Sequence, residues 1–299
     1  MTAEVPTDGF WPAGRTAAAA ITFDLDAESA ILSSVPGSAE RLSLMSHQAY
    51  GPRTGVPRLI RLLRERDLPA TFFVPGFTAE RWPDTVRQIR DEGFEIAHHG
   101  YLHEPLGGDL ATEERNLVRG LEALERIAGV RPIGFRAPNW ETSYATPVLL
   151  ARHGFRYDSS LMDADRPYQL AVGPEADAAR IVEIPIHWGL DDWEQYAYIP
   201  DEERTGHIEN PRKVREMWGA ELRASYAEHG CCIFTMHPFL SGRPSRAAAL
   251  AELLDEMLTL RDAGLWIADV RTIAAHIEKL ELPGVHHSPP EVPAGWLSR

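Results

Sequence analysis

Short apolar runs alternate with amphipathic segments along most of this chain. The runs at 19–26, 70–74, 94–97 and 231–236 are rich in β-branched and aromatic residues and end at polar or Gly/Pro positions, which is typical of buried strands. Further strands are predicted at 133–135, 155–158, 181–186 and 265–267. Helical spacing of apolar residues predicts helices at 56–66, 78–92, 112–128, 146–153, 211–229, 245–263 and 269–279. Strands that alternate with helices in this way predict βα units and a parallel sheet.

The number of βα units favours a barrel over an open doubly wound sheet. Seven or eight such units in a chain of 299 residues fit a distorted (β/α)7-8 barrel. We find no dinucleotide fingerprint, no Gly-rich phosphate loop and no internal repeat, so we expect one domain over 1–299. The connection 27–54 is unusually long, which predicts either a functional loop or structure that the pattern does not reveal.

The composition limits the possible binding partners of the protein and its cellular location. A formal net charge of −14 argues against a nucleic-acid binder and disfavours anionic membranes. No apolar run approaches the roughly 20 residues that span a bilayer, and the N-terminus does not resemble a signal peptide. The two cysteines, Cys231 and Cys232, are adjacent in an apolar run, where a disulfide would be strained. We therefore expect buried thiols and a cytoplasmic location.

Polar residues follow the first and third strands. Asp24 and Asp26 lie on the same face of the first strand, about 6.5 Å apart by strand rise, where mutual repulsion calls for a cation or strong donors. A single aspartate there is explained equally well as a cap of the following turn. His99 and His103 lie in the loop after the strand 94–97, at a spacing that lets both imidazoles face one ion.

Other strand ends add an arginine, a third carboxylate and a further imidazole. Arg136, Asp158 and His237 each follow a predicted strand, and the ends of barrel strands open on one face. Two histidines and one carboxylate with an open position form a recognised catalytic metal set. Such an ion lowers the pKa of a bound water towards about 7, and leftover carboxylate and imidazole groups can act as base and acid. The pattern favours hydrolysis of a C–N bond.

Five ordered segments carry a family resemblance. They are TFDLD at 22–26, EIAHHGYLH at 95–103, RAP at 136–138, DSS at 158–160 and TMHP at 235–238. With them the chain resembles the polysaccharide deacetylases, also called the NodB-homology or carbohydrate esterase 4 group. The match covers about 17–270 and implies a single NodB-like catalytic domain with a barrel fold.

The resemblance also implies roles for individual residues. Asp26, His99 and His103 would bind one divalent metal, with zinc expected, and His98 would be a bystander or a substrate contact.

The acid–base roles follow from the same resemblance. Asp24 would be the catalytic base, Arg136 would orient it, His237 would be the general acid and Asp158 would hold His237.

The chain departs from secreted members of the family. The 27–54 insertion and the segment EIPIHWGLDDWEQY resemble a sub-branch of cytoplasmic-type peptidoglycan deacetylases, allantoinase-like enzymes and cyclic imide hydrolases. Tyr50, Trp140, Trp188 and Trp193 are candidates for the substrate site, and equally for core or interface aromatics.

The leading hypothesis is a metal-dependent hydrolase of a non-peptide C–N bond, on an N-acetyl sugar or a small cyclic amide. An insertion that covers the barrel mouth would favour the small amide or imide. The alternatives are a catalytically silent sugar-binding barrel and a protein that uses zinc for stability, the second of which needs a closed four-ligand site. We expect a homo-oligomer that binds neither nucleic acid nor membrane.

Overall fold

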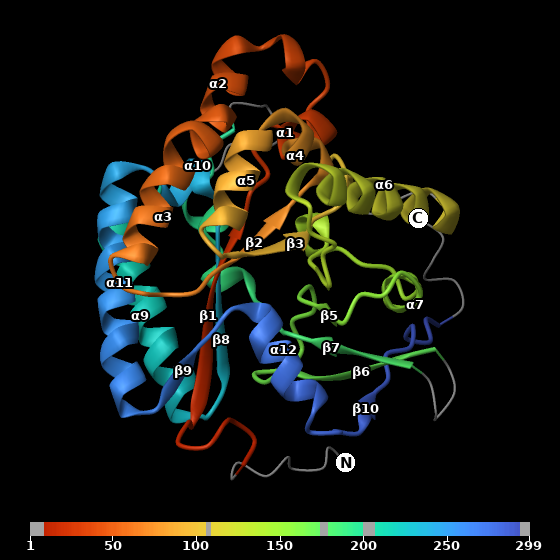
Figure 1. The fold of residues 1–299 in the computed structure, drawn as a ribbon, viewed down its shortest axis with the longest axis vertical. Coiled ribbons are helices and arrows are strands. Elements are labelled where there is room, and N and C mark those ends of the chain that lie inside the picture. Colours follow the sequence, from red (N-terminus) through yellow and green to blue (C-terminus); the bar gives the residue numbers. More distant parts are fainter. Residues whose placement is uncertain (1–8, 106–108, 174–178, 200–206, 294–299) are drawn as a thin grey trace.

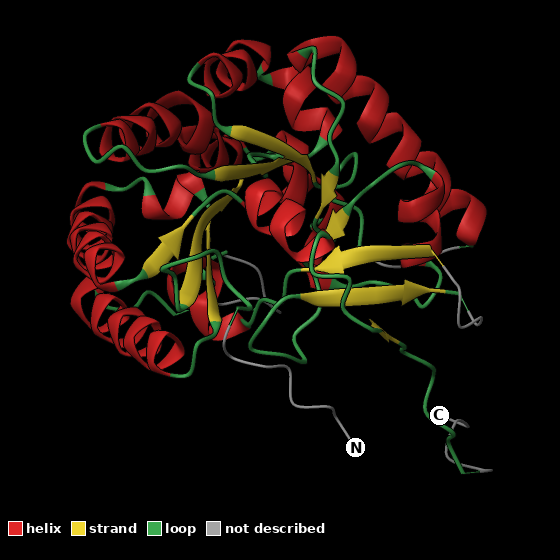
Figure 2. Ribbon diagram, turned by 60° about the horizontal axis from the view of Figure 1, so that its bottom comes forward, coloured by secondary structure: helices red, strands yellow, loops and turns green. Residues whose placement is uncertain are grey.

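The computed structural model describes residues 9–105, 109–173, 179–199 and 207–293. Its centre is one mostly parallel, strongly curved sheet, with helices packed around the outside (Figures 1 and 2). The strands are β1 (Ala17–Asp24), β2 (Thr71–Val74), β3 (Glu95–His98), β4 (Gly134–Phe135), β5 (Tyr157–Asp158), β6 (Tyr168–Val172), β7 (Ala179–Glu183), β8 (Cys231–Met236), β9 (Leu265–Ile267) and β10 (Gly284–Val285). Their order is β10-β6-β7-β5-β4-β3-β2-β1-β8, and β9 pairs with the first half of β1.

The outer helices are α3 (Val56–Arg64), α4 (Gly76–Arg81), α5 (Pro83–Asp91), α6 (Leu110–Ala128), α7 (Thr146–Arg152), α9 (Pro211–Ala227), α11 (Pro244–Ala263) and α12 (Val270–Glu278). Shorter elements are α1 (Ser29–Ser34), α2 (Leu42–Tyr50), α8 (Asp192–Tyr196), α10 (Pro238–Ser241), the 3-10 turns η1 (Ser38–Glu40), η3 (Pro138–Trp140) and η4 (Trp188–Leu190), and the π-helical turn η2 (Gly51–Gly55). Within the described residues, no helix is long and apolar enough to cross a membrane.

The predicted (β/α) barrel is confirmed, and its sheet is not closed. β8 and β10 are the two ends of the sheet, and β6 runs antiparallel to β7. An isolated parallel bridge between Asp191 and Thr235 joins the segment after β7 to the free edge of β8. The segment that follows β7 is therefore tied to the strand that leads to His237.

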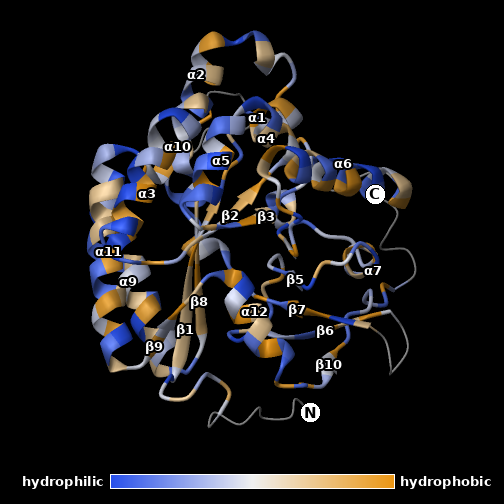
Figure 3. Cartoon of the chain, viewed as in Figure 1, coloured by the Kyte–Doolittle hydropathy of each residue, from blue (hydrophilic) through white to orange (hydrophobic). Residues whose placement is uncertain are grey.

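The alternation along β1 separates the two sides of the barrel wall. Ala17, Ala19, Ile21 and Phe23 belong to the cluster that packs under the outer helices. Alternate positions point the other way, into the barrel, where small alanines leave room at one end and Asp24 stands at the other. Hydrophobic residues dominate β1, β2 and β3, and the outer helices carry hydrophilic residues as well (Figure 3). The same face of one strand thus supplies both barrel packing and a buried carboxylate.

The bottom of the barrel is closed by apolar residues far apart in sequence. Phe10 and Trp11 are buried with Val270 and Ile273 of α12. The indole N–H of Trp11 donates to the carbonyl of His229 at 3.0 Å, which fixes the N-terminal segment against the start of β8. Only the end of the barrel where β1 reaches Asp24 carries the polar groups of the predicted site.

The structure differs from the predicted elements at several places, including the short helices α8 and α10, which were not predicted. The 27–54 connection is helical over most of its length, as α1, η1, α2 and η2. The segment predicted as one helix at 78–92 forms two helices, α4 and α5. Trp82 leaves helical geometry because it precedes Pro83, and Pro83 then starts α5. β6 and β10 at the sheet edge were not predicted. β10 has only two residues, and β6 is defined by its antiparallel pairing with β7, which no local pattern contains.

Candidate active site

A pocket of about 220 Å³ opens where the parallel strands end. Its lining consists of Asp24, Asp26, His99, His103, Asn139, Trp140, Trp188, Asp191, Trp193, Glu194 and His237. The carboxylates and imidazoles form a buried floor, whereas Trp188 and Glu194 are exposed. Five of the seven polar residues predicted from strand ends therefore line the pocket. Arg136 lies behind the floor and contacts Asp24, and Asp158 is the seventh residue, which does not line the pocket.

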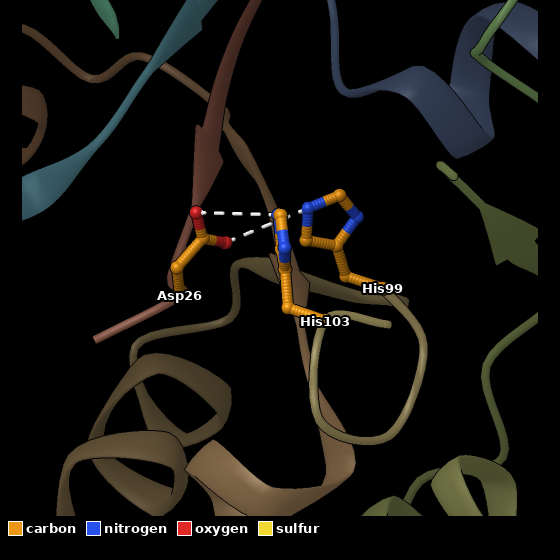
Figure 4. Close-up of side chains that lie close together, drawn as sticks. All are labelled: Asp26, His99 and His103. Atoms are coloured by element: carbon orange, nitrogen blue, oxygen red, sulfur yellow. Dashed lines mark ion pairs between the residues drawn. The ribbon is translucent and has the colours of Figure 1, made fainter. Parts of the chain in front are cut away.

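The three predicted metal ligands lie close together (Figure 4). The Nε2 atoms of His99 and His103 are 3.5 and 3.6 Å from the two carboxylate oxygens of Asp26. Asp26 follows β1, and both histidines come from the loop after β3. His103 has a left-handed backbone (φ 57°), a costly conformation for a non-glycine residue that is typical of functional sites.

The surroundings of these three side chains fit a cation. Both oxygens of Asp26 are buried and accept no hydrogen bond, although a buried carboxylate without a partner is costly. Burial raises the pKa of Asp26, and the nearby imidazoles only partly offset this. His99 Nδ1 lies 2.7 Å from the carbonyl of Arg136, so that nitrogen carries the hydrogen and Nε2 is left with a lone pair facing Asp26. The donor set matches that of a divalent metal site with an open position.

Asp24 is held by an arginine rather than by the candidate ligands. Arg136 is fully buried, and its Nη1 donates to Asp24 Oδ1 at 2.8 Å and to Thr22 Oγ1 at 2.9 Å. Burial raises the pKa of Asp24, but the guanidinium and neighbouring imidazoles outweigh it, so the net pKa is lowered. An ionised carboxylate is thus kept at the pocket floor, with its Oδ2 3.8 Å from His99 Nε2.

The prediction that Asp158 holds His237 is wrong. His237 Nδ1 lies 2.8 Å from Oδ1 of Asp192, which also accepts from the His237 backbone N–H at 2.9 Å. Asp191 Oδ1 is 3.5 Å from the same imidazole nitrogen. Burial lowers the pKa of His237, but Asp191, Asp192 and Asp26 outweigh it and raise the pKa to about 10. A charged imidazole is therefore stabilised with Nε2 directed at the pocket, 3.5 Å from Asp26.

Asp158 stabilises a different part of the site. Its Oδ1 accepts from Ser159 N at 2.8 Å and from Ser160 Oγ at 2.6 Å. Ser159 in turn accepts from Arg136 through its carbonyl and its hydroxyl, at 3.2 and 3.1 Å. Asp158 thus fixes the turn that positions Arg136. The two residues are close because β5 pairs with β4, where Asp158 lies beside Phe135, the residue before Arg136.

Three of the four candidate aromatic residues line the pocket. Trp140 is buried there, Trp193 packs its ring 5.1 Å from that of His237, and Trp188 is exposed. Tyr50 does not line it: its hydroxyl donates to Gly242 and its ring lies under the guanidinium of Arg243. The prediction for Tyr50 is wrong because its side chain packs on the residues that follow α10 instead of facing the pocket.

His98, expected to be a bystander or a substrate contact, is a core residue. Its Nε2 lies 3.1 Å from the carbonyl of Leu117, and its Nδ1 accepts from Gly100 N at 3.1 Å. Burial lowers the pKa of His98 to about 3, so the ring is neutral. It stacks on Phe135 and supports the loop that carries His99 and His103.

Asp191 and Asp192 were not predicted as site residues. They lie in the segment after β7, and the other site residues also come after strands. The Asp-Asp-Trp sequence at 191–193 is therefore a signal that could have indicated them. The strand pattern does not indicate these two residues, because four residues separate Asp191 from the predicted strand 181–186.

Barrel fold, strand-end site and sequence together define the family. The polysaccharide deacetylase family model matches residues 48–157. A peptidoglycan deacetylase from Helicobacter pylori is 31% identical, over 82% of this chain and 90% of that protein. The chain belongs to the polysaccharide deacetylase family, whose members are hydrolases.

Solved structures agree with this assignment. A Mycobacterium smegmatis protein provisionally assigned as a polysaccharide deacetylase is 53% identical, with a TM-score of 0.90 over 94% of this chain and 97% of that one. The PuuE allantoinase shares the fold, with a TM-score of 0.76 at 21% identity over 94% of this chain and 99% of that one. The second likeness extends to architecture alone.

Proposed function

We propose that this protein is a metal-dependent deacetylase that hydrolyses the N-acetyl group of an amino sugar. The observation that carries the proposal is the buried Asp26 carboxylate, which lacks any hydrogen-bond donor and faces two imidazoles. A divalent ion, with zinc expected, would be held by Asp26, His99 and His103 and would polarise an amide carbonyl and lower the pKa of a water molecule.

The remaining floor residues supply the proton transfers. Asp24, kept ionised by Arg136, would take a proton from the attacking water as general base. His237, kept charged by Asp192, would donate from Nε2 to the leaving amine nitrogen. The two groups approach the pocket from β1 and β8, which are neighbouring strands.

A sugar substrate is favoured over a small cyclic amide. A small amide would be favoured if the 27–54 insertion covered the pocket, but none of the pocket-lining residues comes from that insertion. The Helicobacter pylori relative, which is 31% identical over 90% of its own length, is named a peptidoglycan deacetylase. Homo-oligomerisation and a cytoplasmic location stay predictions.

The metal assignment is tested by substitution of each ligand. Asp26→Ala, His99→Ala and His103→Ala should each lose bound metal and acetate release together, measured by elemental analysis and by acetate assay on N-acetylated sugar oligomers. Wild-type metal content in all three variants would refute the ligand set. His207→Ala is the control, because its imidazole is exposed and does not line the pocket.

The acid–base assignment is tested separately from metal binding. Asp24→Asn and His237→Ala should keep metal and lose roughly 10²–10⁴-fold in rate. The pH profile of the wild-type enzyme should be bell-shaped, with the alkaline limb reporting loss of the His237 proton. Near wild-type turnover in either variant would contradict its role, and binding without acetate release by wild-type protein would favour a silent sugar-binding barrel.

A further inference from the structure

Two carboxyl groups that the proposed chemistry does not use are buried next to each other in the sheet. Asp158 at the end of β5 and Glu183 at the end of β7 are paired in register across these parallel strands, so their side chains leave the same face of the sheet. The two residues are only 1% and 0% exposed. Phe135 and Tyr168, their partners in register on β4 and β6, belong to an apolar cluster. Both acids therefore lie where an ionised group is costly.

Each carboxyl group has hydrogen bonds on one oxygen only. Glu183 Oε1 accepts from the backbone N–H groups of Ser160 and Leu161, at 3.1 and 2.9 Å. Asp158 Oδ1 accepts from Ser159 N and Ser160 Oγ, so both acids hold the same turn at 159–161. The second oxygens, Asp158 Oδ2 and Glu183 Oε2, are buried without a hydrogen bond, and among the described residues neither acid forms an ion pair. One hydrogen placed between the two acids would satisfy both oxygens.

We propose that Asp158 and Glu183 hold one proton between them, and that the hydrogen bond it makes positions the turn at 159–161 for catalysis. The proton is carried by Glu183 Oε2 and donated to Asp158 Oδ2, which leaves one negative charge on the pair. Burial raises the pKa of both groups, and the charge of Asp158 raises the pKa of Glu183 further. This agrees with a protonated Glu183 beside an ionised Asp158.

Few other charges act on this pair within the described residues. Arg136, which follows β4, stabilises the negative charge of Asp158, and Asp163 disfavours a charge on Glu183. Tyr168, the partner of Glu183 on β6, is neutral because burial raises the pKa of its hydroxyl. One net negative charge beside one guanidinium is therefore balanced, whereas a second negative charge would have no counterpart.

The turn connects the pair with the proposed catalytic base. Ser159 accepts from Arg136 through its carbonyl and its hydroxyl, and Ser160 Oγ accepts from Ala137 N at 2.9 Å. Arg136 in turn donates to Asp24. Neither acid of the pair lines the pocket, so both are positioning residues, and this role rests on the proposed function.

Amide variants test the shared proton, because an amide has the shape of a carboxyl group and supplies a hydrogen that does not titrate. Glu183→Gln can accept from the turn and donate to Asp158, and Asp158→Asn can do the reverse. Each should shift the midpoint of thermal unfolding by only a few degrees. The double variant has two inner NH2 groups and no acceptor, so its midpoint should fall by more than the sum of the single shifts. Asp165→Asn removes an exposed carboxylate of the same segment, and its combination with Glu183→Gln should be additive.

Kinetics test the positioning role. Glu183→Ala leaves two N–H groups of the turn without an acceptor and should lower kcat for acetate release roughly 10- to 100-fold, with metal content and KM close to wild type. Glu183→Gln should restore most of this loss, because the amide oxygen accepts from the same two groups. The double variant of Asp158→Asn and Glu183→Gln should show a similar fall in kcat, so the test does not depend on the folding of Glu183→Ala.

Four results would overturn the proposal. Additive midpoints in the double variant would show that no proton is shared, and a higher midpoint in both single variants would show two ionised acids that repel each other. A kcat in Glu183→Gln as low as in Glu183→Ala would show that the charge of Glu183 is needed. Wild-type kcat in Glu183→Ala would refute the positioning role. Unfolding midpoints do not depend on the reaction, so a non-additive double variant of a protein that releases no acetate would refute the proposed function and keep the shared proton.

Discussion

At the scale of single residues, the proposed base and the proposed acid are each paired with a buried partner. Asp24 is paired with Arg136, and His237 with Asp192. Asp158 ends a predicted strand, whereas Asp192 comes six residues after the predicted strand 181–186, so the strand pattern points to Asp158. Only the three-dimensional order of the strands decides which one reaches His237, because β5 lies four strands from β1 and the 191–192 segment bridges to β8 itself.

Asp192→Asn should separate these two roles. Asparagine can still accept from the backbone of His237, but it removes a charge that raises the imidazole pKa. We expect kcat to fall roughly 10²-fold or more with unchanged metal content, and the alkaline limb of the pH profile to move to lower pH. Asp158→Asn should leave that limb in place, because its contacts lead to Ser159 and Arg136. A shift of the limb in Asp158→Asn but not in Asp192→Asn would reverse the assignment.

At the scale of elements, apolar periodicity predicted the long strands and helices, and failed where tertiary contacts decide. β1, β8 and α11 were predicted within a few residues. The two strands are continuous apolar runs, and α11 is a long segment rich in the helix formers Ala, Leu and Glu. The helices in 27–54 were missed because Ser, Gly and Pro residues interrupt short pieces of only six to nine residues. Their conformation is stabilised by packing on Ile199 and on α10, which no local pattern contains.

The crossing of η2 and α10 is a sensitive point. Gly55 adopts ordinary helical geometry (φ −65°), yet a Cβ there would lie 2.1 Å from the carbonyl oxygen of Pro238, next to His237. Gly55→Ala should therefore push α10 away, destabilise the fold by about 1–3 kcal/mol and lower kcat by displacing His237. Thermal unfolding and steady-state kinetics measure both effects, with Thr54→Ala as the neighbouring control. Wild-type kcat in Gly55→Ala would show that α10 adjusts without moving the imidazole.

At the scale of the whole molecule, the barrel interior connects the site to its base. The Arg136 guanidinium lies 4.0 Å above the Phe73 ring, and Phe73 contacts the ring of Tyr157. The Tyr157 hydroxyl donates to Glu95 Oε1 at 2.9 Å. The alternation along β1 predicted that polar residues lie on the strand face that points into the barrel. It did not predict the buried carboxyl group of Glu95. Its partners come from β2, β5 and α12, and the sequence alone does not show that they meet.

Glu95 makes the stability of the protein depend on pH. Thr71 Oγ1 and the N–H of Arg271 donate to Glu95 Oε2 at 2.7 and 2.9 Å, but burial and the charge of Asp269 raise the pKa of Glu95 to about 7. Because the folded-state pKa is above the ordinary value of 4.5, the protonated group stabilises the fold fully below pH 4.5. That contribution is lost as the pH rises through 7.

Glu95→Gln should remove this dependence, since the amide mimics the protonated acid at any pH. Relative to wild type, the free energy of unfolding of the variant should rise by up to about 3 kcal/mol between pH 4.5 and pH 8, measured by urea unfolding at several pH values. The exposed helix residue Glu122 provides the control variant Glu122→Gln, which should follow the wild-type curve. A difference between Glu95→Gln and wild type that stays constant with pH would mean that Glu95 is ionised in the fold throughout this range. The hydrogen bonds from Thr71, Tyr157 and Arg271 would then stabilise the charge more than burial in the barrel opposes it.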